Sequence, residues 1–302
     1  MNIVTLTLCP AFDIHCTASS FTAEQENLAT VTDQHAGGKG VNISRALTAY
    51  GINSTAVVVL GEENGESFAA SLARDGLDTR PLYIPGRIRE NVTVHVPGGR
   101  ETRLSFTGAR APADLMARVT EILDPLCNES TVLTLTGRLP DGLPISEVKQ
   151  LIARLTARGV RVVIDSRSFS LDDLIEVRPF LIKPNEEEIA AYTGKRIRTT
   201  ADALTAARAL HERGIENVMI SLGGTGAVLA CAEGDFTVTA PTITPLSTIG
   251  AGDSSIAGFL SALAEGKSPA DCLHTAVAFG SAACLTPGTQ PPKKEDVLRF
   301  LE

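Results

Sequence analysis

Short runs of β-branched residues alternate with helical patterns over most of this 302-residue chain. Strands separated by helices pair in parallel through crossover connections, so this alternation constrains the fold more than any other feature. We expect strands at 3–8, 55–60, 131–136, 160–165, 179–183, 217–222 and, after a glycine turn, 226–232. We expect helices near 40–50, 65–75, 113–126, 146–158, 186–193, 201–213, 251–265, 269–285 and 293–301. The sequence therefore predicts an α/β fold with a mostly parallel, doubly wound sheet.

Two segments interrupt this rhythm. Residues 12–36 are polar with extended pieces, and residues 88–108 are typical of a hairpin, with NVTVHV and ETRLSF on either side of Pro97, Gly98 and Gly99. An isolated two-stranded hairpin is marginal in water. We therefore expect a small β-sheet that projects from the main sheet and either caps a site or pairs with another subunit. No linker or repeat divides the chain, and we treat 1–302 as a single domain.

Composition excludes several classes of protein. A formal net charge of −8, from 27 basic and 35 acidic residues, disfavours nucleic acid as a partner. The apolar runs stay short of the roughly 18 residues that a membrane span requires, and the N-terminus is a strand pattern rather than a signal peptide. The six cysteines are dispersed, which favours a reducing compartment. We expect a cytoplasmic protein with neither nucleic acid nor membrane as partner.

The stretch TIGAGDSSIAGF, residues 248–259, places small residues before a carboxylate. Apolar residues with helical spacing follow, so Gly250, Ala251 and Gly252 lie at a helix N-terminus with Asp253 in its first turn. Free N–H groups and the helix dipole attract an anion at such a tip. The alternative is that Asp253 only offsets the dipole while the glycines make a turn.

A second glycine cluster, HAGGKGVNISRAL at 35–47, precedes another helical pattern. Gly37, Gly38 and Gly40 lie at its start, and Lys39 is embedded among N–H donors suited to an anion. The alternative is a tight turn with a solvated lysine. Two glycine-led helix starts in one chain favour a shared phosphate chemistry.

Two further segments allow a structural and a functional interpretation. In LIKPNEEEIAAYTG, residues 181–194, Asn185 and Glu188 have the spacing of a helix N-cap and its reciprocal partner, which accounts for both. The functional alternative is that they orient the hydrated Mg²⁺ of a nucleotide. In SLGGTGAV, residues 221–228, the glycines make a turn that needs no ligand, or accommodate a phosphate tail or ribose.

Taken together, these segments resemble the PfkB (ribokinase-like) sugar kinase family over nearly the whole chain. The signatures are GGKGVN (37–42), KPNEEE (183–188), SLGGTGA (221–227) and TIGAGDSSIAG (248–258). Three other stretches are most similar to the branch that acts on sugar phosphates, which comprises 1-phosphofructokinase, tagatose-6-phosphate kinase and the minor 6-phosphofructokinase: TLTLCPAFD (5–13), RENVTVHV (89–96) and GSAACLTPGT (280–289). The resemblance implies a ribokinase-like αβα sandwich with a small β-sheet lid formed by residues 12–36 and 88–108.

The resemblance also implies roles, with ATP and Mg²⁺ as cofactors. Asp253 would be the general base, and the amides of Gly250, Ala251 and Gly252 would form an anion hole. The residues implied for the sugar phosphate are Asp13, Gly38, Lys39, Asn42, Arg89 and Asn91. Those implied for the nucleotide are Lys183, Asn185, Ser221, Gly223, Gly226 and Thr248, with residues 277–285 near the adenine. Asn185 and Glu188 would hold the metal through water.

Two departures from the family pattern concern the acceptor. The loop TGRLPDG at 136–142 has Arg138 where a serine is usual, so this cation either grips the substrate phosphate or is solvated. The segment QENLA at 25–29 keeps Asn27 but has Leu28 in place of an arginine. We expect phosphoryl transfer to fructose 1-phosphate. The alternatives are a 6-phosphofructokinase or tagatose-6-phosphate kinase, a kinase of an unphosphorylated sugar or nucleoside, and a non-catalytic sugar-phosphate sensor.

The small sheet also predicts self-association. Sheets with exposed edges tend to pair with other strands, and few strands cannot bury much surface alone. We therefore expect a homodimer that forms through the lid.

Overall fold

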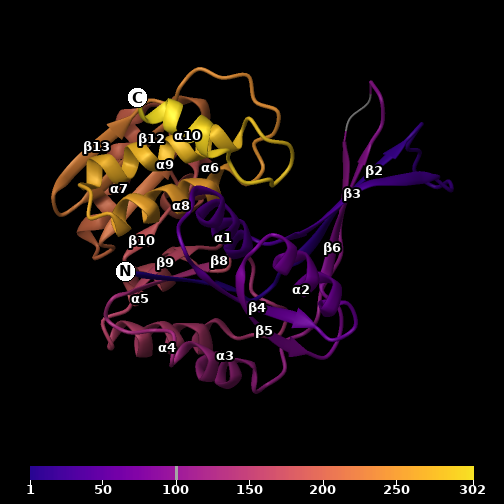
Figure 1. Ribbon diagram of the computed structural model, residues 1–302. Helices are drawn as coiled ribbons and strands as arrows, with labels where there is room; N and C mark the ends of the chain where they lie inside the picture. Colours follow the sequence, from indigo (N-terminus) through magenta and orange to yellow (C-terminus); the bar gives the residue numbers. More distant parts are fainter. Residues whose placement is uncertain (99–100) are drawn as a thin grey trace.

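The computed structural model describes residues 1–98 and 101–302, so Gly99 of the expected hairpin turn lies outside the described residues. The chain forms one large and one small β-sheet, with helices on both faces of the large one (Figure 1). This arrangement confirms the predicted α/β sandwich.

The large sheet has nine strands in the order β13-β12-β11-β10-β9-β8-β1-β4-β5. All neighbours from β5 to β11 pair in parallel, whereas β12 and β13 are antiparallel. The mostly parallel sheet that the βαβ pattern predicted is thus confirmed. The strands are β1 (Asn2–Thr7), β4 (Thr55–Gly61), β5 (Asp78–Ile84), β8 (Thr131–Thr136), β9 (Arg161–Asp165), β10 (Leu181–Ile182), β11 (Asn217–Ser221), β12 (Ala227–Cys231) and β13 (Gly234–Val238).

Helices cover both faces of this sheet because its strands are apolar on both sides. In β1, Val4 and Leu6 pack into the core on one face, whereas Ile3 packs into the core on the other. The first face is covered by α3 (Leu115–Leu123), α4 (Ile145–Thr156), α5 (Leu171–Val177), α6 (Glu186–Thr193) and α7 (Thr200–Glu212). The second is covered by α1 (Lys39–Tyr50), α8 (Ala251–Ala264), α9 (Pro269–Ala283) and α10 (Lys294–Leu301). Within the described ranges, no helix is long and apolar enough to cross a membrane.

A third apolar cluster joins the two sheets. It packs α2 (Gly65–Arg74) against β4 through Phe68 and Leu72, and it includes Phe12 and Ala36 from the small sheet. The rings of Phe12 and Phe68 meet edge to face with centroids 5.1 Å apart. This cluster anchors the base of the small sheet on the large one.

The small sheet has the order β3-β2-β6-β7 and projects away from the sandwich (Figure 1). It comprises β2 (Ala11–Ala18), β3 (Ala29–Gly37), β6 (Arg89–His95) and β7 (Thr102–Ser105). β2 starts four residues after β1 ends, so the small sheet grows from the carboxyl edge of the large sheet. The two segments that were expected to form it, 12–36 and 88–108, do so.

The structure corrects the expected elements at several points. β5, β13 and α5 were not predicted: β5 holds Pro81 and lies at a sheet edge, where proline is tolerated, and the other two are short. The strand expected at 179–183 is only Leu181–Ile182. Pro179 and Pro184 flank it, and proline cannot donate to a strand ladder.

Candidate active site

Charged side chains from four elements meet at the carboxyl edge of the large sheet, where ligands of open α/β sheets bind. Asp165 ends β9, and Lys183 directly follows β10. On the helical side, Lys39 opens α1 and Asp253 lies in the first turn of α8. The sequence predicted three of these four residues as site residues and gave Asp165 no role.

The tip of α8 depends on its glycines. Gly250 is the N-cap with φ of 80°, a left-handed conformation that favours glycine. A Cβ at Gly252 would come within 2.9 Å of the Lys183 Nζ. Glycine at position 252 therefore lets the ammonium approach the helix tip, where free N–H groups already favour an anion.

The Asp253 side chain is buried, with 7% of its surface exposed. Asn42 Nδ2 donates a hydrogen bond of 2.9 Å to Asp253 Oδ2, which joins α1 to α8. Burial raises the pKa of Asp253 from 3.8 to about 6, and the Lys39 ammonium only partly opposes this effect. A carboxylate with such a pKa is suited to accept a proton near neutral pH.

Asp165 lies between two lysines. Its Oδ1 is 3.0 Å from Lys39 Nζ, and its Oδ2 is 3.8 Å from Lys183 Nζ. Burial opposes ionisation, but these ammoniums outweigh it and hold the pKa of Asp165 below its usual value. Partial burial likewise opposes the Lys39 charge, yet the Asp165 and Asp253 carboxylates raise the pKa of Lys39. An acidic residue that ends a predicted strand was the signal that would have located Asp165.

The start of α1 is packed tightly against β1. Gly38 has φ of 138°, and a Cβ at Gly40 would collide with Thr7. The Asn42 N–H donates to the Gly38 carbonyl over 2.9 Å, so Asn42 lies one turn into the helix. The glycines thus bring both Lys39 and Asn42 to the edge of the sheet.

Three predicted residues of the small sheet form one hydrogen-bond chain. Asn91 Nδ2 donates to Asp13 Oδ1 over 2.8 Å, and Arg89 Nη1 donates to Asn91 Oδ1 over 2.9 Å. The parallel register of β2 and β6 places Asp13 directly opposite Asn91. Within the described chain the buried Arg89 Nε has no hydrogen-bond partner. The hydrogen-bond chain therefore ends at the Arg89 guanidinium, which still has an N–H donor to offer to another group.

Arg138 lies on the loop after β8 and forms an ion pair of 2.8 Å with Asp141. More than half of its side chain is exposed, at 53%. Cys9, which follows β1, lies between Arg138 and Arg89: burial raises the pKa of the Cys9 thiol, and both guanidiniums oppose that effect. Cys9 belongs to the stretch TLTLCPAFD, but the sequence analysis gave it no role.

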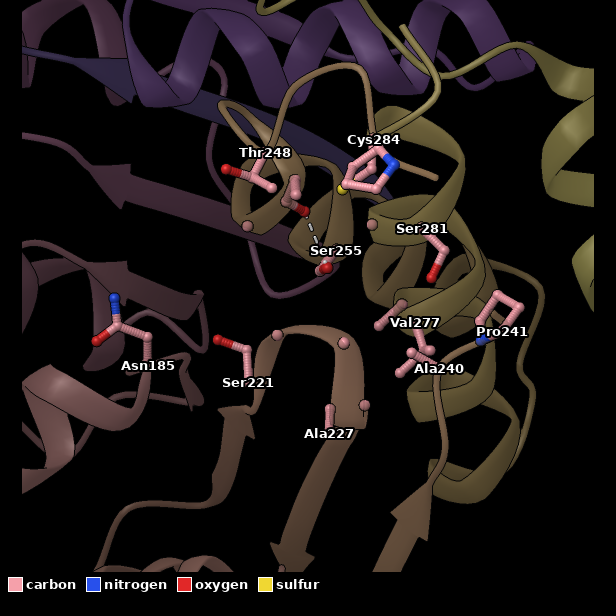
Figure 2. A pocket seen from close by; sticks show the side chains of 18 of the residues that line it. Asn185, Ser221, Ala227, Ala240, Pro241, Thr248, Ser255, Val277, Ser281 and Cys284 are labelled. Atoms are coloured by element: carbon pink, nitrogen blue, oxygen red, sulfur yellow. Dashed lines mark hydrogen bonds between the residues drawn. The ribbon is translucent and has the colours of Figure 1, made fainter. Parts of the chain in front are cut away.

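A pocket of about 610 Å³ lies beside the tip of α8, within the range of small-molecule and cofactor sites. All six residues predicted for the nucleotide line it, namely Lys183, Asn185, Ser221, Gly223, Gly226 and Thr248, together with Ala251 and Gly252 of the predicted anion hole. Figure 2 shows Asn185 and Ser221 at one end and Ala240, Pro241 and Val277 at the other. The end with Asn185 and Ser221 is polar and also holds Lys183, whereas the end with Ala240, Pro241 and Val277 is apolar. A nucleotide fits such a pocket because its phosphates are charged and its base has apolar faces. The segment that carries Ala240 and Pro241 had no signal in the sequence.

The capping interpretation of Asn185 and Glu188 is confirmed. Asn185 Oδ1 accepts from the Glu188 N–H, and Glu188 Oε2 accepts from the Asn185 N–H. Glu188 Oε1 also accepts from Arg167 Nε over 2.8 Å. The cap does not test whether Asn185 and Glu188 also hold a metal through water, and that role stays a prediction.

The surroundings of Glu188 are compatible with a water-mediated metal. Glu188, Asp165 and Lys183 border a space of about 10 Å³, which is close to the size of one water. In the part of the chain that the structure describes, no three acidic, histidine or cysteine side chains are grouped to hold a metal directly. A space for one water beside Glu188 is compatible with Mg²⁺ that arrives with a nucleotide and keeps its own waters.

The fold and the pocket together define a class: α/β sandwich proteins with a glycine-led helix tip beside a pocket of cofactor size and with a small second sheet. The chain belongs to the pfkB family of carbohydrate kinases, whose model matches residues 3–296.

Relatives and solved structures extend this assignment. The chain is 32% identical to 1-phosphofructokinase of Escherichia coli K12 over 283 residues, which is 93% of this chain and 90% of that protein. Its fold matches phosphofructokinase-2 of Escherichia coli in complex with substrates and products, with a TM-score of 0.92, 29% identity and coverage of 100% and 98%. A tetrameric inhibited form of that enzyme matches with a TM-score of 0.89, 28% identity and coverage of 99% and 98%.

The raised pKa of Asp253 predicts that this residue costs stability at neutral pH. The pKa of Asp253 in the folded state exceeds 3.8, so folding favours the protonated carboxyl. The contribution of this group to the free energy of unfolding is therefore fully present below pH 3.8 and is lost as the pH rises through about 6. The loss is at most about 3 kcal/mol. We expect Asp253→Asn, which keeps the Asn42 hydrogen bond, to raise the melting temperature at about pH 8 and to change it little at about pH 4.

The matched control is Asp271→Asn, which changes an exposed aspartate in the first turn of the neighbouring α9. This variant loses the Asp271 carboxylate that accepts from Ser268 and is expected to lower stability slightly. Thermal unfolding that shows Asp253→Asn equal to or below the parent protein at about pH 8 would contradict the burial argument.

Proposed function

We propose that this protein transfers the γ-phosphoryl group of ATP to a hydroxyl of a ketohexose phosphate. Fructose 1-phosphate is the proposed acceptor, and fructose 1,6-bisphosphate is the product. One observation carries the proposal: Asp253 accepts a hydrogen bond from Asn42 on the sugar side, while on the nucleotide side Lys183 Nζ lies so close that a Cβ at the neighbouring Gly252 would come within 2.9 Å of it. Family membership and a relative named 1-phosphofructokinase support it.

In the proposed reaction, Asp253 accepts the proton of the acceptor hydroxyl. The hydroxyl oxygen forms a bond to the γ-phosphorus while the bond from that phosphorus to the ADP oxygen breaks, and ADP leaves with the electron pair. The N–H groups of Gly250, Ala251 and Gly252 face the charge that develops on the transferring group. Phosphoryl transfer needs mostly positioning and charge stabilisation, and a helix tip supplies both.

The nucleotide is proposed to lie in the 610 Å³ pocket, with its phosphates toward Lys183 and its base toward Val277. Mg²⁺ bound to ATP neutralises phosphate charge and orients the γ-phosphoryl group. Glu188 and Asn185 are proposed to hold waters of that ion. Glu188 also stays in its cap and its pair with Arg167, so it contributes through water rather than as a direct ligand.

The sugar phosphate is proposed to lie between α1 and the small sheet, which then acts as a lid. Gly38, Lys39, Asn42, Asp13 and Asn91 line this side, and Arg89 suits bidentate binding of a phosphate. Because the protein has a net charge of −8 and both substrates are anions, local cations must create the positive field at the site. Fructose 6-phosphate and tagatose 6-phosphate are the competing acceptors within this class.

The proposed base is tested with Asp253→Asn. The amide cannot accept a proton, so we expect kcat to fall by a factor on the order of 10³ while the Kd for ATP changes by less than about threefold. Steady-state kinetics and calorimetric titration with ATP measure the two quantities. Asp271→Asn is the control with unchanged turnover, and more than about a tenth of the parent kcat in Asp253→Asn would refute the assignment.

The proposed phosphate contact of Arg138 is tested with Arg138→Ser, which restores the residue usual in the family. Loss of a charge-assisted hydrogen bond raises the KM for fructose 1-phosphate by about tenfold or more. We expect the kcat for fructose 1-phosphate to change little in this variant. With unphosphorylated fructose we expect a low rate in the parent protein and in Arg138→Ser alike. Arg154→Ser on α4 is the control, because Arg154 is similarly exposed, at 55%, and pairs with Asp124, which directly follows α3.

The same assay separates the alternatives when fructose 1-phosphate, fructose 6-phosphate, tagatose 6-phosphate and fructose are compared. An unchanged KM in Arg138→Ser shows that the arginine is merely solvated. A preference for fructose points to a kinase of unphosphorylated sugars. ATP that is never consumed with any acceptor points to a sensor built on the kinase fold.

We also propose that the protein forms a homodimer through the small sheet. Three large apolar side chains on this sheet or directly after it are exposed: Val31 at 58%, Leu104 at 45% and Phe106 at 52%. Val31 is opposite Cys16 and Leu104 is opposite Val92, so both lie on the apolar face of the sheet. An apolar face of this kind favours a second copy of the same chain.

Sedimentation velocity at micromolar concentration tests this proposal. We expect a dimer for the parent protein and a monomer for Val31→Asp combined with Leu104→Asp, because two buried carboxylates would oppose the interface. Leu298→Asp on α10, where the leucine is also 45% exposed, is the control that keeps the dimer. A parent protein that sediments as a monomer would rule out the lid interface.

A further inference from the structure

We propose that Asp165 is a positioning residue that holds Lys39 and Lys183 at separate places beside Asp253 and so leaves the Asp253 carboxylate free to accept a proton. The proposal rests on the proposed function, because it assigns a role in the same phosphoryl transfer. Asp165 is not argued to touch either substrate.

The position of Asp165 allows it to hold both lysines at once. It ends β9, in the middle of the sheet, and 4% of its side chain is exposed. Its two oxygens face different lysines, Lys39 at 3.0 Å from α1 and Lys183 at 3.8 Å from the end of β10. Among the described residues, Asp165 Oδ2 has no hydrogen-bond partner, so its charge acts mainly on these cations.

Without Asp165 the lysines would turn to Asp253. Lys183 is nearly buried, with 6% of its side chain exposed, and a buried ammonium requires a counter-charge. Asp253 is the other buried carboxylate at this edge, and both lysines already act on it electrostatically. An ion pair between either lysine and Asp253 would occupy the oxygens that must accept the proton.

Charged and polar groups from three elements act on Asp253. Lys39 and Asn42 come from α1, Asp165 from β9 and Lys183 from the end of β10. Burial raises the pKa of Asp253 most, the lysines and Asn42 lower it, and Asp165 raises it. Removing the Asp165 charge while both lysines remain therefore lowers the pKa of Asp253. A purely structural role would leave that pKa where it is.

The first test is the pH dependence of kcat/KM in Asp165→Asn, which keeps the shape and removes the charge. The parent protein is expected to lose activity below about pH 6, where Asp253 becomes protonated. In Asp165→Asn we expect this acidic limb to move to lower pH by about one unit and kcat to fall at least about tenfold. Asp165→Glu keeps the charge and is expected to keep the position of the limb.

The second test reads Asp253 without turnover. In a carboxyl ¹³C NMR titration, the Asp253 signal is the one that Asp253→Asn removes. Its midpoint is expected at about 6 in the parent protein and at lower pH in Asp165→Asn. Asp75→Asn is the matched control: it breaks the 2.7 Å ion pair with Arg45 on α1 and is expected to leave the midpoint unchanged.

A second variant covers the case in which Asp165→Asn does not fold with two uncompensated lysines. Asp165→Asn combined with Lys183→Met removes one charge of each sign, and the midpoint is still expected to fall, because Asp165 affects Asp253 more strongly than Lys183 does. A midpoint that stays near 6 in either variant overturns the proposal. The NMR result stands whether or not any sugar phosphate is phosphorylated, so the two failures are distinguishable.

Discussion

The structure depends on one electrostatic arrangement: a buried carboxylate, Asp253, at a helix tip, with two neighbouring ammoniums that are paired to a different carboxylate. Lys39 and Lys183 both lie nearest to Asp165, and Asp253 accepts a neutral hydrogen bond from Asn42. A buried base is costly, as its raised pKa indicates. The fold bears this cost where two strand ends and two helix starts converge.

The remaining architecture places partners around that carboxylate. The parallel sheet brings the ends of β9 and β10 side by side, and α1 and α8 cover the same face, so their N-termini meet above it. Glycines permit the close approaches, as Gly252 does for Lys183. The small sheet, anchored by Phe12 on Phe68, adds the hydrogen-bonded chain of Asp13, Asn91 and Arg89 from the opposite side.

Much of this could be predicted from the sequence because local patterns carry it. The βαβ rhythm fixed the sheet, and glycine-led helix starts located Lys39 and Asp253. Asp165 ends a predicted strand but was given no role, since it acts only through lysines that are distant in the chain, and β5 was missed because Pro81 weakens its strand pattern. The acceptor sugar, the oligomeric state and the cytoplasmic location depend on other molecules or on the cell, which the fold of one chain does not specify. All three stay predictions.

The most direct measurement is a crystal structure with a non-hydrolysable ATP analogue and fructose 1-phosphate bound together. We expect the acceptor hydroxyl oxygen within about 3 Å of an Asp253 oxygen and the γ-phosphate oxygens within about 3 Å of the Gly250–Gly252 amides. Lys39 and Lys183 would stay beside Asp165. An Asp253 carboxylate that is ion-paired with a lysine, or that points away from both ligands, would contradict the account.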